Sequence, residues 1–157
     1  RKESTMENSE VVLQKGCVKV PNFDFNALSQ VIDTVNGESK IPNPYLNNYI
    51  LESSFQLMDA QMHPIFHSVW NEFEKNFNPH GRRSNIVLFF SFCSGGRSNA
   101  HADVEDVKIF GLYGKTIYII NGNEYIVTQG DLLHIPKNTV HRGIGISPRI
   151  IGSYGIW

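Results

Sequence analysis

Short apolar runs separated by turn residues dominate the chain from residue 85 onward. Their length and their content of β-branched and aromatic residues are typical of β-strands. Between two of them, Asn121-Gly122 predicts a tight hairpin, because both residue types tolerate positive φ. With one N-terminal β segment the runs make about eight strands, the count of a double-sheet jelly roll. The runs are residues 86–92, 107–113, 116–120, 124–128, 131–135, 139–145 and 149–156.

The first part of the chain predicts β structure and then a helix that flanks the strands. Residues 11–23 read as one or two β segments. Residues 24–37 predict a short helix that Asp24 or Asn26 caps and a glycine ends. Its apolar face consists of Leu28, Val31, Ile32 and Val35.

A second helix is predicted from about Asp59 to Phe77, with Pro64 in its first turn. Its apolar side chains recur at helical spacing, and such a stripe usually packs on a sheet instead of forming a ligand site. The fold class is therefore mainly β with flanking helices. The stripe consists of Ile65, Phe66, Val69, Trp70, Phe73 and Phe77.

The segment before the second helix, residues 39–54, is rich in proline, asparagine and tyrosine and has no regular periodicity. It forms either a flap over the mouth of the barrel or a plain connection. His63 and His67 have the spacing of a metal-binding pair, but no third ligand lies nearby in the sequence. We interpret them, together with His80, as surface or packing histidines.

Length and composition fit one globular domain. The chain has 157 residues, a formal net charge of −1 and 41% hydrophobic residues, which suits a single core. We assign residues 11–157 to this domain, with the N-terminal β segment and helices in residues 11–80 and the barrel core in residues 81–157. Residues 1–10 are polar and charged, and we expect a disordered lead-in.

Several functional classes find no support in the sequence. No apolar run is long enough to span a bilayer and no signal-peptide core is present, so we expect a cytoplasmic protein without a membrane partner. Near-neutral charge gives no footprint for nucleic acid. Cys17 and Cys93 lack the spacing of a zinc or redox pair and are expected to be reduced, in or near the core. Homodimer formation remains open.

The residues with the clearest chemistry are His101, Asp103 and His141. In an extended segment alternate side chains share a face, so His101 and Asp103 can point to one spot while Ala102 points away. A later strand, turn and strand can bring His141 back to the same spot. Two imidazoles and one carboxylate on one side of an ion are the ligand set of non-haem Fe(II) sites that bind a co-substrate and dioxygen.

Two glycines share the face of His141 when its strand is counted by twos, Gly143 and Gly145. Glycine in a strand marks a close backbone approach, a bend or a barrel corner. Beside a metal, the missing side chains would also leave space for a co-substrate.

The pattern HADVED, then Gly114, then GDLLHIPKNTVH, within residues 85–157, resembles the cupin superfamily. Within it, the chain is similar to 2-oxoglutarate-dependent oxygenases of the cupin and Jumonji type. Ordinary metallocupins carry His-x-His and a later glutamate, whereas this chain has Asp103 at the second position and Val107 near the place of the glutamate. Glu105 and Asp106 are out of place for that role. The departure favours the oxygenase branch.

The resemblance implies a basic residue that pairs with the distal carboxylate of 2-oxoglutarate. The lysine of Jumonji-type relatives falls on Thr116 here, with Lys115 one position early. In the prolyl-hydroxylase-like branch, a basic residue opens the final strand with a hydroxyl residue four positions later, and Arg149 and Ser153 match those places. We predict Arg149 as the anchor and Lys115 as second choice. Weaker candidates for polar contacts with the co-substrate are Ser98, Thr116 and Tyr118.

The predicted function is that of an Fe(II)- and 2-oxoglutarate-dependent dioxygenase, an oxidoreductase that hydroxylates a C–H bond of a protein side chain or a small metabolite. Fe(II) and the co-substrate 2-oxoglutarate are the small molecules that this prediction requires. His134 is expected to be structural. The alternative is a non-oxygenase metallocupin, either an isomerase or a small-ligand-binding protein, and a metal-free structural cupin is a third interpretation.

Overall fold

The structure is a computed structural model, and it describes residues 10–19, 22–36, 54–92, 94 and 99–157. Within these ranges it contains two α-helices, one short 3-10 helix and nine strands. In chain order the elements are β1 (Val12–Gln14), α1 (Phe25–Asn36), β2 (Phe55–Leu57), η2 (Ala60–Met62), α2 (Pro64–Phe77), β3 (Ser84–Ser91), β4 (Asp106–Tyr113), β5 (Thr116–Ile120), β6 (Asn123–Val127), β7 (Leu132–Ile135), β8 (His141–Gly145) and β9 (Arg149–Ile156).

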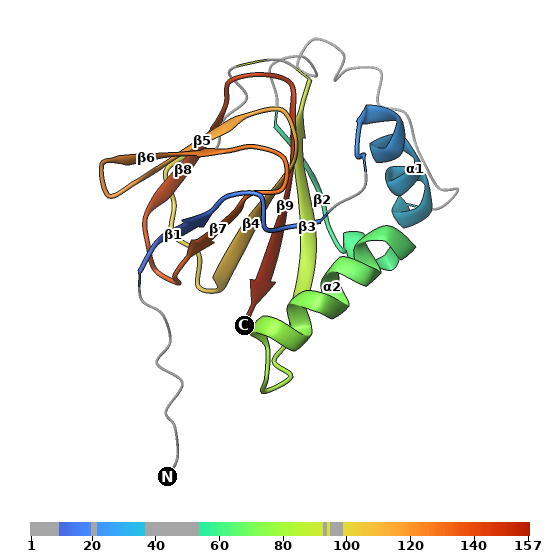
Figure 1. The fold of residues 1–157 in the computed structure, drawn as a ribbon, viewed down its shortest axis with the longest axis horizontal. Helices are drawn as coiled ribbons and strands as arrows, with labels where there is room; N and C mark the ends of the chain where they lie inside the picture. The colour runs from blue at the N-terminus through green and yellow to red at the C-terminus, as the bar shows by residue number, and fades with distance from the viewer. Residues whose placement is uncertain (1–9, 20–21, 37–53, 93, 95–98) are drawn as a thin grey trace.

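The strands form two antiparallel sheets. The larger has the order β1-β7-β4-β9-β3-β2 and the smaller the order β6-β5-β8. Both helices lie on the side of the larger sheet that faces away from the smaller sheet, as Figure 1 shows. The predicted mainly β, jelly-roll fold with flanking helices is confirmed. Every apolar run predicted as a strand forms one.

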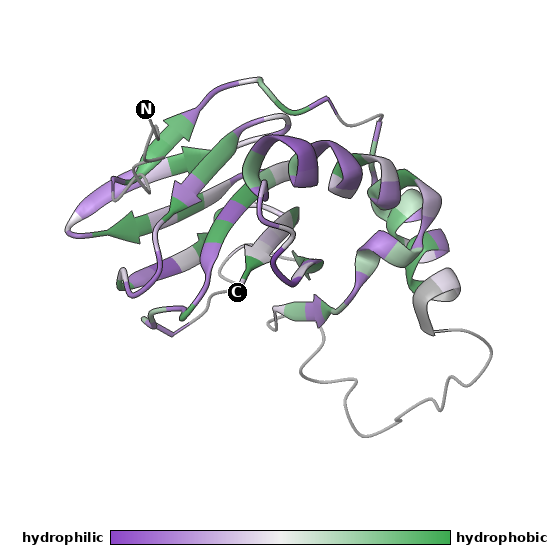
Figure 2. Cartoon of the chain, turned by 90° about the horizontal axis from the view of Figure 1, so that it is seen from below, coloured by the Kyte–Doolittle hydropathy of each residue, from purple (hydrophilic) through white to green (hydrophobic). Residues whose placement is uncertain are grey.

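The larger sheet is covered on both faces, and this explains the nearly continuous apolar sequences of its strands. On β3, Ile86, Leu88 and Phe90 pack in the cluster that includes α1 and α2. The next residue positions point the other way, because strand side chains alternate. A second cluster between the sheets contains Val107, Ile109, Tyr118, Ile120, Val127, Leu133, Ile135 and Ile151. Figure 2 shows hydrophobic and hydrophilic residues alternating along several strands.

The start of α1 agrees with the prediction and selects one of its two caps. The Asp24 carboxylate accepts a hydrogen bond from the Ala27 backbone at 2.9 Å, so Asp24 and not Asn26 caps the helix. Leu28 and Val31 are buried as expected. The side chain of Val35 and the predicted terminator Gly37 lie outside the described residues.

The second helix begins later than predicted. Asp59 has a left-handed conformation with φ 58°, and the 3-10 helix η2 separates it from α2. Pro64 occupies the start of α2, and His63 before it is extended with ψ 138°. A residue before proline avoids helical geometry, so a continuous helix from Asp59 is excluded. The predicted apolar stripe is confirmed, because Phe66, Val69 and Phe73 are buried against the sheet.

The predicted hairpin at Asn121-Gly122 is confirmed, with φ of 51° and 78° at the two residues. The short strand β2 was not predicted. It occupies three residues next to the irregular segment 39–54, of which only Ser54 is described. Three residues are too few to show a period of two.

The histidines of the helical region lie in capping, packing or surface positions. His63 caps α2 by accepting a hydrogen bond from the Ile65 backbone at 3.3 Å, and His67 packs beside the Trp70 ring. His80 is exposed. Cys17 is free, as predicted, but it is exposed and does not lie in or near the core, while Cys93 lies outside the described residues. No described helix is long and apolar enough to cross a membrane.

Candidate functional site

Backbone hydrogen bonds join the two chain segments that carry the predicted metal ligands. His101 and His141 form an antiparallel bridge, in which each backbone N–H donates to the carbonyl of the other, at 3.0 and 2.8 Å. In the turn before β8, the Asn138 N–H donates to the Asp103 carbonyl at 2.7 Å. Residues about forty positions apart in the sequence are therefore held together by main-chain contacts, independently of their side chains.

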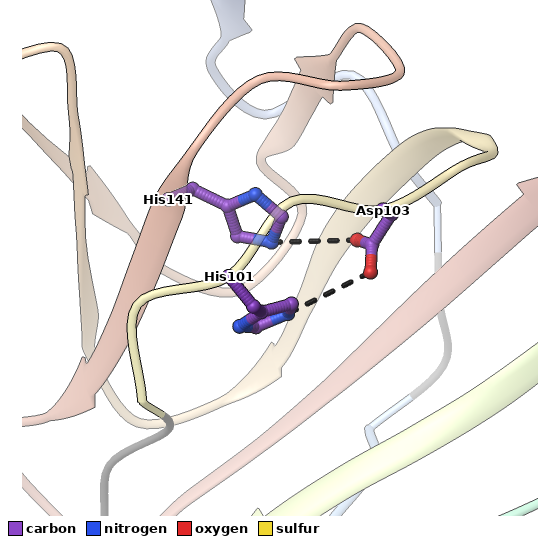
Figure 3. A group of neighbouring side chains, drawn as sticks. All are labelled: His101, Asp103 and His141. Atoms are coloured by element: carbon purple, nitrogen blue, oxygen red, sulfur yellow. Dashed lines mark ion pairs between the residues drawn. The ribbon is translucent and has the colours of Figure 1, made fainter.

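The three side chains converge, as Figure 3 shows. The Asp103 carboxylate faces both imidazoles from one side, with Oδ1 3.7 Å from Nε2 of His101 and Oδ2 3.4 Å from Nε2 of His141. All three donor atoms lie within 4.8 Å of one another. Ligands bound to one ion at about 2.1 Å, and roughly 90–110° apart, are separated by about 3.0–3.4 Å. The observed spacing is close to that of a metal-binding triad, so the residues fit a divalent ion.

Both imidazoles are oriented in the same way by the backbone. Nδ1 of His101 lies 2.7 Å from the Asn99 carbonyl and Nδ1 of His141 lies 2.9 Å from the Thr139 carbonyl. A carbonyl can only accept, so each Nδ1 carries the proton and each Nε2 presents its lone pair. A hydrogen bond from the distal imidazole N–H to a carbonyl is the usual support for a metal-bound histidine.

The triad differs in exposure from one residue to the next. The His141 side chain is 5% exposed, that of Asp103 31% and that of His101 46%. Ala102 between them is also exposed. The triad therefore has one deeply buried ligand and a side that remains accessible.

The triad lines a cavity of approximately 320 Å³ between the two sheets. On β9 the alternate residues Arg149, Ile151, Ser153 and Gly155 face this cavity, while the residues between them belong to the helix-side cluster or pack beside it. A volume of about 300 Å³ or more is in the range of small-ligand sites. The other lining residues include Ser54, Gln56, Met58, Asn85, Val87, Phe89, Glu105, Val107, Ile109, Tyr118, Gly143 and Trp157.

Arg149 is a buried guanidinium at the cavity wall, 3% exposed. Its Nε donates to the Ser91 hydroxyl at 3.3 Å and its Nη2 to the Ser54 hydroxyl at 3.2 Å. It also forms a side-chain hydrogen bond with Tyr118. Hydrogen bonds with three hydroxyls thus restrict the orientation of the guanidinium.

Burial acts on the charge states of both partners. Desolvation lowers the pKa of Arg149, although the contact with Tyr118 opposes this; an arginine starts so high that it stays cationic at neutral pH. Burial raises the pKa of Tyr118 to about 12, and the neighbouring Arg149 only partly counteracts it. At neutral pH Tyr118 is therefore a neutral hydroxyl and Arg149 a cation, a pair suited to bind an anion.

The two glycines after His141 do not leave empty space, and this corrects the prediction from the sequence. A Cβ at Gly143 would lie 3.2 Å from the Tyr118 ring, and a Cβ at Gly145 would lie 2.7 Å from Nε of Arg149. The volume that the glycines release is filled by Tyr118 and Arg149.

The remaining candidates lie in different places. Ser153 lines the cavity. Thr116 is fully buried, and its hydroxyl has no hydrogen-bond partner among the described residues. Lys115 is exposed in the turn before β5 and does not line the cavity. Ser98 lies outside the described residues. His134 contacts the Lys108 ammonium at 3.1 Å, on β7 and β4, which agrees with a structural role.

Several contributors to the cavity were not identified from the sequence, and Glu105 and Ser91 are two of them. Glu105 lines the cavity, and counting by twos from Asp103 would have found it, because Asp103, Glu105, Val107 and Ile109 all line the same cavity. Ser91 ends β3 and contacts Arg149 across a separation of 58 residues. No local pattern in the sequence marks such a contact.

Neither a protein-family model nor a curated protein matches the sequence. Among solved structures, the chain is similar to the ribosomal oxygenase YcfD from Escherichia coli in complex with cobalt and 2-oxoglutarate, with a TM-score of 0.74 and 17% identity. The complex of the same protein with cobalt and succinic acid gives 0.73 and 17%. Each alignment covers 94% of this chain and 48% of the YcfD chain, so this chain spans about half the length of those proteins. At this identity the likeness shows the fold alone.

Proposed function

We propose that this chain is the catalytic domain of an Fe(II)- and 2-oxoglutarate-dependent oxygenase that hydroxylates a C–H bond of a protein side chain or a small metabolite. The observation that carries the proposal is the convergence of His101, Asp103 and His141 at a cavity that also holds a buried arginine. One ligand set for a divalent ion and one cationic anchor face the same cavity.

His101, Asp103 and His141 would hold the metal. Two neutral imidazoles and one carboxylate leave further coordination positions open, as an oxygenase requires and as a closed structural zinc site does not. The accessible side of the triad, at His101 and Asp103, supports this assignment. The carbonyl contacts of Asn99 and Thr139 would keep both Nε2 atoms available.

Arg149 and Tyr118 would bind the distal carboxylate of 2-oxoglutarate. The guanidinium supplies charge and directional donors, and the neutral phenol supplies a further donor. Thr116 pairs with Gly145 across β5 and β8, beside the volume that Arg149 fills, and its hydroxyl lacks a partner among the described residues. A buried hydroxyl without a partner is unfavourable by about 1–3 kcal/mol, so a carboxylate in reach of Thr116 would remove a cost. The YcfD complexes with cobalt and 2-oxoglutarate and with cobalt and succinic acid also support this ligand.

When bound, the metal and 2-oxoglutarate supply the oxidising chemistry, in which dioxygen, the keto acid and a C–H bond give succinate, carbon dioxide and an alcohol. The protein's own residues orient the reactants and limit access of water. Val107, Ile109 and Ile151 form an apolar wall of the cavity, and Asp103 and the two histidines fix one side of the metal position. Arg149 sets the orientation of the co-substrate along the cavity.

Anaerobic calorimetry tests the proposal. Fe(II) should bind with one equivalent per chain, and 2-oxoglutarate should bind tightly only to the metal-loaded protein, because one end chelates the ion and the other contacts Arg149. Lys115→Ala is the matched control, since Lys115 is exposed outside the cavity. Metal binding without any binding of 2-oxoglutarate would contradict the proposal and favour a non-oxygenase metallocupin.

A further inference from the structure

Gly145 and Arg149 approach each other more closely than a side chain at position 145 would allow. An ideal Cβ there would lie 2.7 Å from Nε, 2.9 Å from Cδ of Arg149 and 3.2 Å from Oγ of Ser91. We propose that Gly145 is a positioning residue, which seats Arg149 in its orientation at the cavity and thereby sets the affinity for the co-substrate carboxylate. This inference rests on the proposed function.

The backbone of Gly145 does not itself require glycine. Its φ lies outside the left-handed region, unlike those of Gly114 and Gly130, which are +70° and +83°. Position 145 is an ordinary strand position, paired with Thr116 on β5. Residues with side chains adopt such a conformation freely. The reason for glycine here is therefore space, and Arg149 occupies that space.

The surroundings leave Arg149 little freedom to move aside. Its side chain contacts both Gly145 on β8 and Ser91 on β3, and Ser91 accepts a hydrogen bond from the same Nε that approaches Gly145. A methyl group at position 145 would displace Nε and Cδ, which are in the middle of the side chain and not at its flexible end. The contacts with Ser91 and Tyr118 would change together, since one rigid guanidinium makes both.

The strand geometry offers graded comparisons. At Gly143 an added Cβ would lie 3.2 Å from the Tyr118 ring, which is tight but tolerable after a small shift. At Gly155, on the same cavity, the nearest atom belongs to Trp157 at 3.7 Å, an ordinary van der Waals contact. Alanine should therefore have a large effect on Arg149 at position 145, a small effect at position 143 and no effect at position 155. Gly155→Ala is the matched control, because it also adds one methyl group to a strand beside the cavity.

The first experiment observes Arg149 without metal or co-substrate, so it is independent of the proposed function. The Nε–H resonance of Arg149 is identified in an NMR spectrum of ¹⁵N-labelled protein by its loss in Arg149→Lys. It should shift or broaden in Gly145→Ala and stay in place in Gly155→Ala. An unchanged resonance in folded Gly145→Ala would overturn the inference.

The second experiment measures binding of 2-oxoglutarate to the anaerobic Fe(II)-loaded protein. Gly145→Ala should weaken binding at least about tenfold, the usual consequence of losing a good hydrogen bond to a charged group. The Fe(II) affinities of Gly145→Ala and Gly155→Ala should both stay within about twofold of the wild-type value. A difference of that size is below the resolution of such free-energy comparisons.

A double mutant separates positioning from general damage to the strand. If Gly145 acts through Arg149, Gly145→Ala should add nothing to the loss already caused by Arg149→Ala. Additive losses would mean that Gly145 acts by another route and would overturn the inference. If the wild-type protein binds no 2-oxoglutarate, the proposed function fails, while the NMR result still decides whether Gly145 positions Arg149.

Discussion

Replacement of Arg149 by alanine should weaken co-substrate binding and leave the metal site intact. Arg149 is buried at the cavity wall and held by Ser91, Ser54 and Tyr118. The substitution removes the cation and leaves the histidines and Asp103 in place.

The magnitude follows from the contacts that are lost. A hydrogen bond to a charged group contributes about 1.5–3 kcal/mol, and a buried carboxylate left without its partner adds to the loss. Since about 1.4 kcal/mol is a factor of ten in affinity, Arg149→Ala should need at least about tenfold more 2-oxoglutarate. Arg149→Lys should recover part of this loss, because the charge returns without the planar fork.

The assay is formation of succinate against 2-oxoglutarate concentration, with Fe(II) affinity measured separately. Arg149→Ala should raise the apparent KM and leave Fe(II) affinity unchanged, and Lys115→Ala should resemble wild type. A large rise in KM for Lys115→Ala, with none for Arg149→Ala, would refute the reasoning and place the anchor at the turn before β5. If neither variant changes the apparent KM, another residue binds the distal carboxylate; if the wild-type protein forms no succinate, 2-oxoglutarate is not the co-substrate.

Three further predictions concern the metal and the stability of the fold. Alanine in place of any one of the three ligands should reduce Fe(II) affinity severely with an unchanged circular dichroism spectrum, and wild-type affinity in two of these variants would contradict the triad. Asp131 is buried, and although desolvation raises its pKa, hydrogen bonds from Lys15 and nearby groups lower the pKa overall. Because the pKa is lower in the folded state, the ionised carboxylate stabilises the fold at pH values above the unfolded-state pKa of about 3.8. This stabilisation is lost as the pH falls through the folded-state pKa. Asp131→Asn should therefore flatten the acid side of the stability curve measured by urea unfolding, and an unchanged acid slope would count against this. The Glu74 carboxylate accepts hydrogen bonds from the Tyr154 and Ser84 hydroxyls. Glu74→Ala should therefore lower the free energy of unfolding by about 2–4 kcal/mol without changing the Fe(II) affinity. A loss of stability below about 0.5 kcal/mol would refute this prediction.

The strands could be predicted because each carries its own signal. A short apolar run such as residues 86–92 is typical of a strand within a buried sheet. Asn121-Gly122 fits few structures other than a hairpin. The late start of α2 was predictable in principle from Pro64, since the residue before a proline avoids the helical region. Strand β2 was not, because its three residues gain their conformation from pairing with β3.

In the candidate site, too, some features could be predicted from local sequence and others could not. His101 and Asp103 were predicted to converge from alternation alone, and the structure brings His141 to them through a backbone bridge. The occupants of the volume beside Gly143 and Gly145 could not be predicted, because Tyr118 and Arg149 come from other strands. Contacts such as that of Arg149 with Ser91 depend on the register between β3 and β9, which the sequence does not display. The segment 39–54 lies almost wholly outside the described residues, and its role as a flap or connection stays a prediction.

The central claim is that one cavity holds both the metal and 2-oxoglutarate, and anaerobic absorption spectroscopy tests it most directly. Addition of 2-oxoglutarate to the Fe(II)-loaded protein should produce the weak visible charge-transfer band of a metal-chelated keto acid. The band should be absent in His141→Ala and should need at least about tenfold more 2-oxoglutarate in Arg149→Ala. Fe(II) bound at one equivalent with no band at saturating 2-oxoglutarate would contradict the account.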